Sequence, residues 1–354
     1  MTFHVPAIDI SPYLSPASDP GSIGARQRVA REFDSACREV GFVQVHGHGI
    51  PAEVVDGLAA ASDDFFVGLD SVRKKAYRTP SGINRGYSPP KSEATSLSLG
   101  VEPANKMNDF FEAFNVGLTV EDYADAELLE EAYQRNVWPD IPLFRERVER
   151  YLAEARRVAG VLMQLSTDGL GLPAGFFEEA FTHATGTMRM NNYALTPGMN
   201  VTLDGELRGM GEHTDFGVIT VLWADRVQGL QVLGADGGWY DVQPDEGALL
   251  VNLGDVTARW TNEHWMSTLH RVKPPVVDGT IIRRRSVAYF HGCNWDALVE
   301  PLPELLAEGE RPLYAPVSAT EHMRAKLAGT RAGVLNPNAE RESARVISAR
   351  SARS

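Results

Sequence analysis

Cysteine is scarce in this 354-residue sequence, which contains only Cys37 and Cys293. Two distant cysteines without a Cys-x-x-Cys pair offer neither a disulfide framework nor a zinc finger. Long apolar runs are absent as well, since none approaches the ~20 residues that a membrane-spanning helix needs. The amino terminus has no basic segment followed by an apolar stretch, so a signal peptide is not expected. We therefore expect a cytoplasmic protein that is not inserted in a membrane.

Basic residues are also fewer than acidic ones. The chain has 34 Lys and Arg against 47 Asp and Glu, a formal net charge of −13. An acidic surface repels phosphate backbones, so a nucleic-acid partner is not expected. With 43% hydrophobic residues the chain can bury a substantial core. The expected partner is a small-molecule substrate; the oligomeric state stays open, and a monomer is compatible with the sequence.

The apolar pattern changes character about halfway along the chain. Up to residue 170 the apolar side chains recur mainly at helical spacing. From about 187 to 292, short strands alternate with Gly, Pro and Asp turns, a pattern typical of a β-sandwich or barrel. A stretch at 79–105, rich in Gly, Pro, Ser and Asn, predicts a long ordered loop. Helices are predicted over 22–40, 51–67 and 142–170, and strands over 42–45 and 110–116.

The strongest chemical motif is His213-Thr214-Asp215, followed by His270 at 55 positions beyond Asp215. Side chains two residues apart on a strand point to the same face. Two imidazoles and one carboxylate on one side of an octahedral metal leave the other positions open, which is the arrangement of non-haem Fe(II) oxygenases. The alternative is a surface turn in which Asp215 caps a loop. Metal binding therefore depends on companion residues elsewhere in the chain.

Other histidines compete for the third ligand position. His264 lies six residues before His270. We prefer His270 because it follows a short strand-like run and is itself followed by Arg271-Val272. His46 and His48 form a second His-x-His pair, but they stand among glycines with no acid nearby, which favours a structural role.

A possible anion site follows the metal motif. Arg284 and Ser286 lie 14 and 16 residues after His270 and would share one face of a strand. A guanidinium fork beside a hydroxyl suits a carboxylate. Upstream, Asn191 and Tyr193 would also share a face and could hydrogen-bond the same anion. The alternatives are an exposed basic strand and a tyrosine buried in the core.

Several further segments stand in the same order as in a known family. The chain resembles the isopenicillin N synthase-like branch of the Fe(II)/2-oxoglutarate-dependent dioxygenases over most of its length. One departure is the run His291-Gly292-Cys293-Asn294, where the family often has a proline, so no relative's substrate is transferred. Besides the motifs above, the matching segments are Val5–Ile10, Ala36–Phe42, His48–Pro51, Arg85–Tyr87, Gly229–Val232, Gly247–Asp255 and Thr261-Asn262.

The resemblance implies a mainly β fold with flanking helices around a double-stranded β-helix, or jelly-roll, core. It implies Fe(II) as cofactor, with 2-oxoglutarate and O2 as co-substrates. His213, Asp215 and His270 would hold the iron. Residues that would bind 2-oxoglutarate are Arg284, Ser286, Tyr193 and Asn191. The regions expected are an N-terminal region of helices and strands at 1–120, a helical support at 121–186, the oxygenase core at 187–300, a helical segment at 301–335 and a disordered tail at 336–354.

The expected activity is oxidation of a small molecule, by hydroxylation, desaturation or cyclisation, in natural-product or specialised metabolism. Three alternatives stay open: an iron oxidase of the isopenicillin N synthase type that uses no 2-oxoglutarate, a non-catalytic cupin-like metal-binding protein, and a zinc hydrolase. Candidate walls of the substrate pocket are Tyr87, Asn108, Phe110, Trp260, Phe290 and Asn294.

Overall fold

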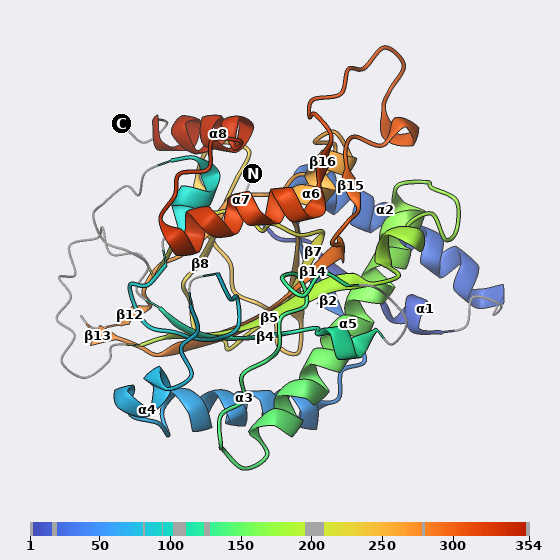
Figure 1. The fold of residues 1–354 in the computed structure, drawn as a ribbon. Coiled ribbons are helices and arrows are strands. Elements are labelled where there is room, and N and C mark those ends of the chain that lie inside the picture. The colour runs from blue at the N-terminus through green and yellow to red at the C-terminus, as the bar shows by residue number, and fades with distance from the viewer. Residues whose placement is uncertain are drawn as a thin grey trace.

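The computed structural model describes residues 3–15, 20–80, 82–93, 95–101, 111–123, 128–194, 209–277 and 280–351. Two β-sheets form its centre (Figure 1). The strands of the eight-stranded sheet, in spatial order, are β1 (Ala7–Asp9), β2 (Phe42–His46), β10 (Leu249–Leu253), β7 (Ile219–Ala224), β14 (Arg284–Asn294), β5 (Ala184–Tyr193), β4 (Glu112–Gly117) and β3 (Gly86–Ser88). Those of the four-stranded sheet are β6 (Met210–His213), β11 (His270–Val272), β8 (Leu230–Leu233) and β9 (Trp239–Asp241).

The inner faces of the two sheets enclose one cavity, because β5, β7 and β14 line it from the large sheet and β6, β8 and β11 from the small one. This two-sheet arrangement agrees with the β-sandwich or barrel predicted for 187–292. Two short strand pairs lie outside it: β12 (Val276–Val277) with β13 (Thr280–Ile281), and β15 (Leu298–Val299) with β16 (Val317–Ser318).

Helices cover the other face of the large sheet. In Figure 1, α3 and α5 lie along one side of this sheet and α7 along the opposite side. Phe65 on α3 packs against Phe114 of β4, with ring centroids 4.6 Å apart. The helices are α1 (Ser11–Leu14), α2 (Pro20–Glu39), α3 (Ala52–Phe66), α4 (Ser71–Lys75), α5 (Phe144–Gly169), α6 (Asp255–Trp260), α7 (Ala319–Ala332) and α8 (Glu340–Ser351), with 3-10 turns at Thr95–Leu99, Val120–Asp122, Glu179–Phe181 and Pro303–Leu305.

Strand β5 shows how the sequence sorts side chains between core and cavity. Met188 and Met190 are fully buried in the core cluster beneath the helices. Thr187, Arg189 and Asn191 point to the opposite face and line the cavity. The strict alternation of a strand therefore gives β5 one apolar face and one polar face. The polar face supplies functional groups, and the apolar face anchors the strand.

The predicted helices at 22–40, 51–67 and 142–170 correspond to α2, α3 and α5. Gly41 follows α2 with a φ of 70°, the left-handed conformation that commonly ends a helix. No helix in the described ranges is both long and apolar enough to cross a membrane.

The expectation of a disordered tail at 336–354 is wrong for most of that segment. Residues 340–351 form α8, and Val346 is almost completely buried with Leu99, Val101 and Leu269. Arg341 also forms an ion pair of 2.6 Å with Glu263. The sequence pattern is misleading because one valine and a set of ion pairs hold this polar helix in place.

The packing of α8 makes a stability prediction. Val346→Ala should lower the free energy of unfolding by about 1–3 kcal/mol, because it removes buried methyl groups. Ile347→Ala is the matched control, since Ile347 is 56% exposed on the same helix and should change stability by less than about 0.5 kcal/mol. Urea denaturation measures both variants. Equal, small effects would show that α8 does not pack as described.

Candidate active site

The two histidines of the motif meet across a pair of strands. β6 and β11 are antiparallel, and His213 is the cross-strand partner of His270. Their ring centroids lie 4.2 Å apart. Asp215 comes from the turn after β6 rather than from the strand itself, which corrects the expectation that His213 and Asp215 share one strand face. The potential ligand atoms of all three residues nevertheless lie within 4.8 Å of one another.

Backbone carbonyls determine which imidazole nitrogen is free. Nδ1 of His213 lies 2.8 Å from the carbonyl oxygen of Gly211, and Nδ1 of His270 lies 3.0 Å from that of Thr268. A carbonyl can only accept, so each Nδ1 donates and the Nε2 of each ring is the nitrogen available to a metal. Burial, with repulsion from His270, lowers the pKa of His213 to about 4. The imidazole of His213 is therefore neutral near pH 7, as a metal ligand must be.

The carboxylate of Asp215 is oriented by two donors. Its Oδ2 accepts hydrogen bonds of 2.6 Å from Thr220 Oγ1 and of 2.6 Å from Asn252 Nδ2. The other oxygen, Oδ1, faces Nε2 of His270 at 3.8 Å. Two Nε2 lone pairs and one carboxylate oxygen thus converge, and this donor set fits Fe(II). Sequence reasoning assigned no role to Thr220 or Asn252, although Asn252 lies in a segment that resembles the family.

A buried ion pair supports the turn that bears Asp215. The backbone N–H of Asp255 donates to the carbonyl of Asp215 at 2.8 Å, and Oδ2 of Asp255 accepts from Thr214 Oγ1 at 3.2 Å. Lys326 on α7 lies 2.7 Å from the same oxygen, and both side chains are 2% exposed. Burial opposes ionisation of Asp255, but the charge of Lys326 prevails and holds its pKa at about 2. Helix α7 is therefore connected to the turn that bears Asp215.

The predicted anion-binding residues also come together. Strand pairing places Arg284 opposite Tyr193 and Ser286 opposite Asn191. All four line the same cavity as the metal ligands, a space of about 250 Å³. Arg284 is 2% exposed; its Nε donates to the carbonyl of Val227 at 3.3 Å, whereas its Nη1 has no hydrogen-bond partner among the described residues. A buried guanidinium with an unused donor fits a carboxylate ligand.

The neighbouring arginines, in contrast, face away from this cavity. Arg283 and Arg285 form ion pairs of 2.5 and 3.0 Å with Asp63 of α3. These two side chains connect helix α3 to the large sheet. His264 bonds Glu310 at 3.1 Å and does not join the metal cluster, in agreement with the choice of His270.

The predicted pocket walls are only partly brought to the cavity. Phe290 lines it. Tyr87 is not among the lining residues: its ring packs in the core, and its hydroxyl donates to Glu112 at 2.7 Å. Trp260 likewise packs in the core, stacked on Phe177 at 5.2 Å. Asn108 and Phe110 lie outside the described residues.

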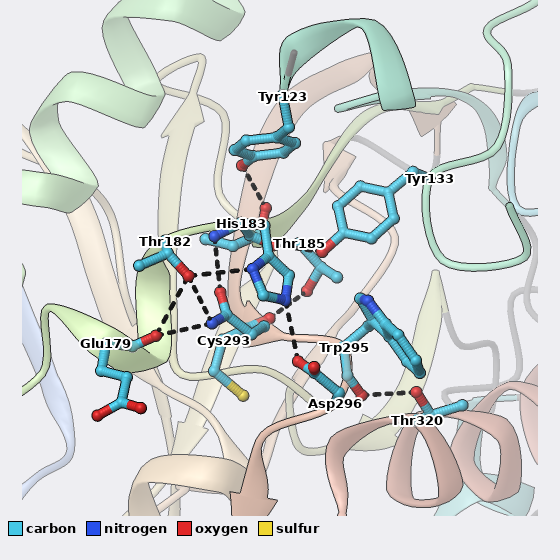
Figure 2. Close-up of polar contacts among 12 residues, drawn as sticks. Tyr123, Tyr133, Glu179, Thr182, His183, Thr185, Cys293, Trp295, Asp296 and Thr320 are labelled. Carbon is cyan, nitrogen blue, oxygen red and sulfur yellow. Dashed lines mark hydrogen bonds and ion pairs between the residues drawn. The ribbon is translucent and has the colours of Figure 1, made fainter. Parts of the chain in front are cut away.

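Asn294 joins two chain segments instead of lining the cavity. Its Oδ1 accepts from the backbone N–H of His183 at 2.8 Å. Its Nδ2 donates to the carbonyl of Glu179 at 2.7 Å and to Thr182 Oγ1 at 3.0 Å. Figure 2 shows this polar cluster, in which His183 also contacts Asp296 at 2.9 Å. The sequence alone did not distinguish this structural role from a place in the cavity wall. Other residues of β14 do line the cavity, whereas Asn294 is the last residue of that strand.

Comparison with known proteins identifies the family. Residues 5–141 match the family model described as "non-haem dioxygenase in morphine synthesis N-terminal". Residues 185–292 match the family model of the 2OG-Fe(II) oxygenase superfamily. The chain is also 33% identical over 307 residues to validamycin A dioxygenase of Streptomyces hygroscopicus subsp. limoneus, covering 85% of this chain and 80% of that protein. The chain belongs to the 2OG-Fe(II) oxygenase superfamily.

Other members of the superfamily share sequence and structure with this oxygenase. It is 31% identical over 304 residues to homoarginine-6-hydroxylase of Glycine max, covering 84% of this chain and 88% of that one. The crystal structure of a full-length Neurospora crassa protein in complex with alpha-KG and thymine superposes with a TM-score of 0.76 at 26% identity. That match covers 92% of this chain and 96% of the Neurospora chain.

The oxygenase is therefore a 2-oxoglutarate-dependent dioxygenase with the double-stranded β-helix fold, and it uses Fe(II), 2-oxoglutarate and O2 to oxidise a small molecule. The relatives named as 2-oxoglutarate-dependent favour this conclusion over an iron oxidase that uses no 2-oxoglutarate, a cupin-like binding protein and a zinc hydrolase.

The hydrogen bond from Asn252 to Asp215 makes a prediction about metal affinity. Asn252→Ala should weaken Mn(II) or Fe(II) binding about 10–100-fold, because groups that orient a ligand contribute that much. Asn336→Ala is the control, since Asn336 is equally buried but donates to the carbonyl of Ser98. Anaerobic metal titration measures both. If Asn336→Ala loses as much metal affinity as Asn252→Ala, the loss comes from a general effect on the fold and not from the orientation of Asp215.

Proposed function

We propose that His213, Asp215 and His270 hold the Fe(II) of this oxygenase. Each offers one atom to a common point, namely Nε2 of the two histidines and Oδ1 of Asp215. Three protein ligands on one side leave positions for a co-substrate and O2 on the other. The observation that supports this role best is the convergence of three correctly oriented ligand atoms on the cavity.

Arg284 and Ser286 are proposed to bind the distal carboxylate of 2-oxoglutarate, with Tyr193 and Asn191 beside them. The support is the burial of Arg284 and its unused Nη1. Arg284 also lies over the ring of Tyr193 at 5.3 Å, which fixes the guanidinium in the cavity. The other end of 2-oxoglutarate would then reach the open side of the iron.

When bound together, the iron, 2-oxoglutarate and O2 would supply an oxidant able to remove hydrogen from an unactivated C–H bond, with CO2 and succinate as by-products. The chain's own contribution is to position the reactants and to exclude water. Asp215 is held in one orientation by Thr220 and Asn252, and apolar side chains such as Leu222 and Phe290 line the cavity. A dry, fixed site confines oxidation to the bound substrate, whose fate is hydroxylation, desaturation or cyclisation.

The setting is inferred from composition and from relatives. Relatives include a validamycin A dioxygenase and the 2-oxoglutarate-dependent dioxygenase citB of Monascus ruber. From these relatives we infer a role in natural-product or specialised metabolism, and we propose a cytoplasmic setting. A nucleic-acid partner is not proposed, because the chain is strongly acidic.

The anion site can be tested with two adjacent arginines. Arg284→Lys should weaken 2-oxoglutarate binding to the Mn(II)-loaded protein at least about tenfold, since a lysine cannot reproduce the guanidinium fork. Arg283→Lys is the matched control, because Arg283 pairs with Asp63 on the other face of the sheet. Calorimetric titration measures both affinities. Unchanged affinity in Arg284→Lys would place the 2-oxoglutarate carboxylate elsewhere.

A further inference from the structure

A second group of arginines lines the cavity away from Arg284. Arg85 precedes β3, Arg189 lies on β5 and Arg331 lies on α7, yet all three reach the same space. Along β5, Arg189 lies four residues from Tyr193, which is about 13 Å at the rise of a strand. Arg189 is thus separated from Tyr193 and from Arg284, which pairs with Tyr193 across the strands, although its Nε donates to Asn191 Oδ1 at 3.1 Å.

One carboxylate balances these three charges only in part. Arg189 Nη2 forms an ion pair of 2.5 Å with Glu93, which is buried and does not itself line the cavity. Among the described residues, no other acid forms an ion pair with any of the three arginines. The exposed pair of Arg324 with Glu131, 2.7 Å apart at the same cavity, adds no net charge. Two positive charges thus remain within this part of the structure.

Within the described ranges, Arg85 and Arg331 donate hydrogen bonds to neutral oxygen atoms only. Nη1 of Arg85 donates to the carbonyl of Asn84 at 2.8 Å, and Nη2 to that of Leu118 at 3.1 Å. Nη1 of Arg331 donates to the carbonyl of Ile83 at 2.6 Å and to Asn84 Oδ1 at 3.0 Å. Arg85 is 3% exposed, and its Nε has no partner among the described residues. Burial and the charge of Arg331 lower the pKa of Arg85 to about 10.

The iron end of the cavity cannot supply the missing negative charge. In the proposed function, the charges of Fe(II), Asp215, the 2-oxoglutarate dianion and Arg284 cancel. Excess positive charge on the buried Arg85 and the half-buried Arg189 and Arg331 is costly unless an anion enters. The primary substrate is the component of the reaction still unaccounted for. Arg189 lines the same cavity as His213, Asp215 and His270, so an anion held by Arg189 would share that space with the iron.

We propose that Arg85, Arg189 and Arg331 bind a carboxylate of the primary substrate, which makes this oxygenase specific for small organic acids. The inference rests on the proposed function for the iron and 2-oxoglutarate sites. Leu327, one turn before Arg331 on α7, also lines the cavity, as do Met323 and Phe290. The substrate is therefore an acid with an apolar body, whose carboxylate binds the arginines while a C–H bond lies over the iron.

Matched acid and amide pairs test this specificity. The protein is loaded with Mn(II) and 2-oxoglutarate without O2, so that binding occurs without turnover. It is then titrated with aryl- and alkyl-carboxylates of graded length and with their primary amides. At least one acid should bind tenfold or more tightly than its amide, because a charge-assisted hydrogen bond is lost in the amide. Equal affinity throughout the series, including no binding by either member, would overturn the proposal.

Two substitutions should shift that preference in opposite directions. Arg331→Gln should remove most of the acid-over-amide difference, whereas Glu93→Gln should strengthen acid binding about threefold or more, since it frees Arg189. Arg150→Gln, at an exposed ion pair on α5, is the control and should change nothing. If Arg331→Gln folds poorly, Glu93→Gln still tests the proposal, because unchanged or weaker acid binding would contradict it.

Two further measurements distinguish a site for a substrate acid from a second co-substrate site and from a phosphate site. The affinity for 2-oxoglutarate should be unchanged in Arg331→Gln; a tenfold loss would mean that these arginines serve the co-substrate, and would overturn the proposal. Failure of 2-oxoglutarate to bind the unaltered protein would instead count against the proposed function.

Phosphate monoesters of the same chain lengths form the second anion series. Their tighter binding than the carboxylates would overturn the assignment of a carboxylic acid.

Discussion

The antiparallel pairing of β6 with β11 is the contact on which the active site depends. It places His213 directly opposite His270, and the neighbouring carbonyls turn both imidazoles so that their Nε2 atoms face one point. A shift of one residue in this register would send one histidine to the other face of its sheet. The pairing of β14 with β5 has the same role for the co-substrate, because it sets Arg284 opposite Tyr193.

Asp215 depends on a different kind of support. It lies in a turn, so its position comes from Thr220, Asn252 and the backbone of Asp255 rather than from a strand ladder. Asp255 is in turn paired with Lys326 on α7, the helix that also carries Arg331 into the cavity. One helix thus contacts both the metal-ligand turn and the proposed substrate-acid site. Through this helix, substrate binding would be coupled to the geometry of the iron ligands.

Much of this site could be predicted from local spacing. The alternation of a strand was enough to group Arg284 with Ser286 and Asn191 with Tyr193, and the structure brings all four to one cavity. The roles of Tyr87, Trp260 and Asn294 could not be predicted, because burial in a core or in a polar junction depends on distant segments. The Lys326–Asp255 pair was missed for the same reason, and α8 because its few apolar contacts give almost no periodic signal.

The central claim is that one cavity holds iron at the histidines and two distinct anion sites, one at Arg284 and one at Arg85, Arg189 and Arg331. Anaerobic crystals grown with Fe(II) and 2-oxoglutarate, with diffraction recorded at the iron absorption edge, test it most directly. The account predicts anomalous density bonded to Nε2 of His213 and His270 and to Asp215, with the distal carboxylate of 2-oxoglutarate on Arg284. Iron bound elsewhere, or that carboxylate on Arg189 and Arg331, would contradict it.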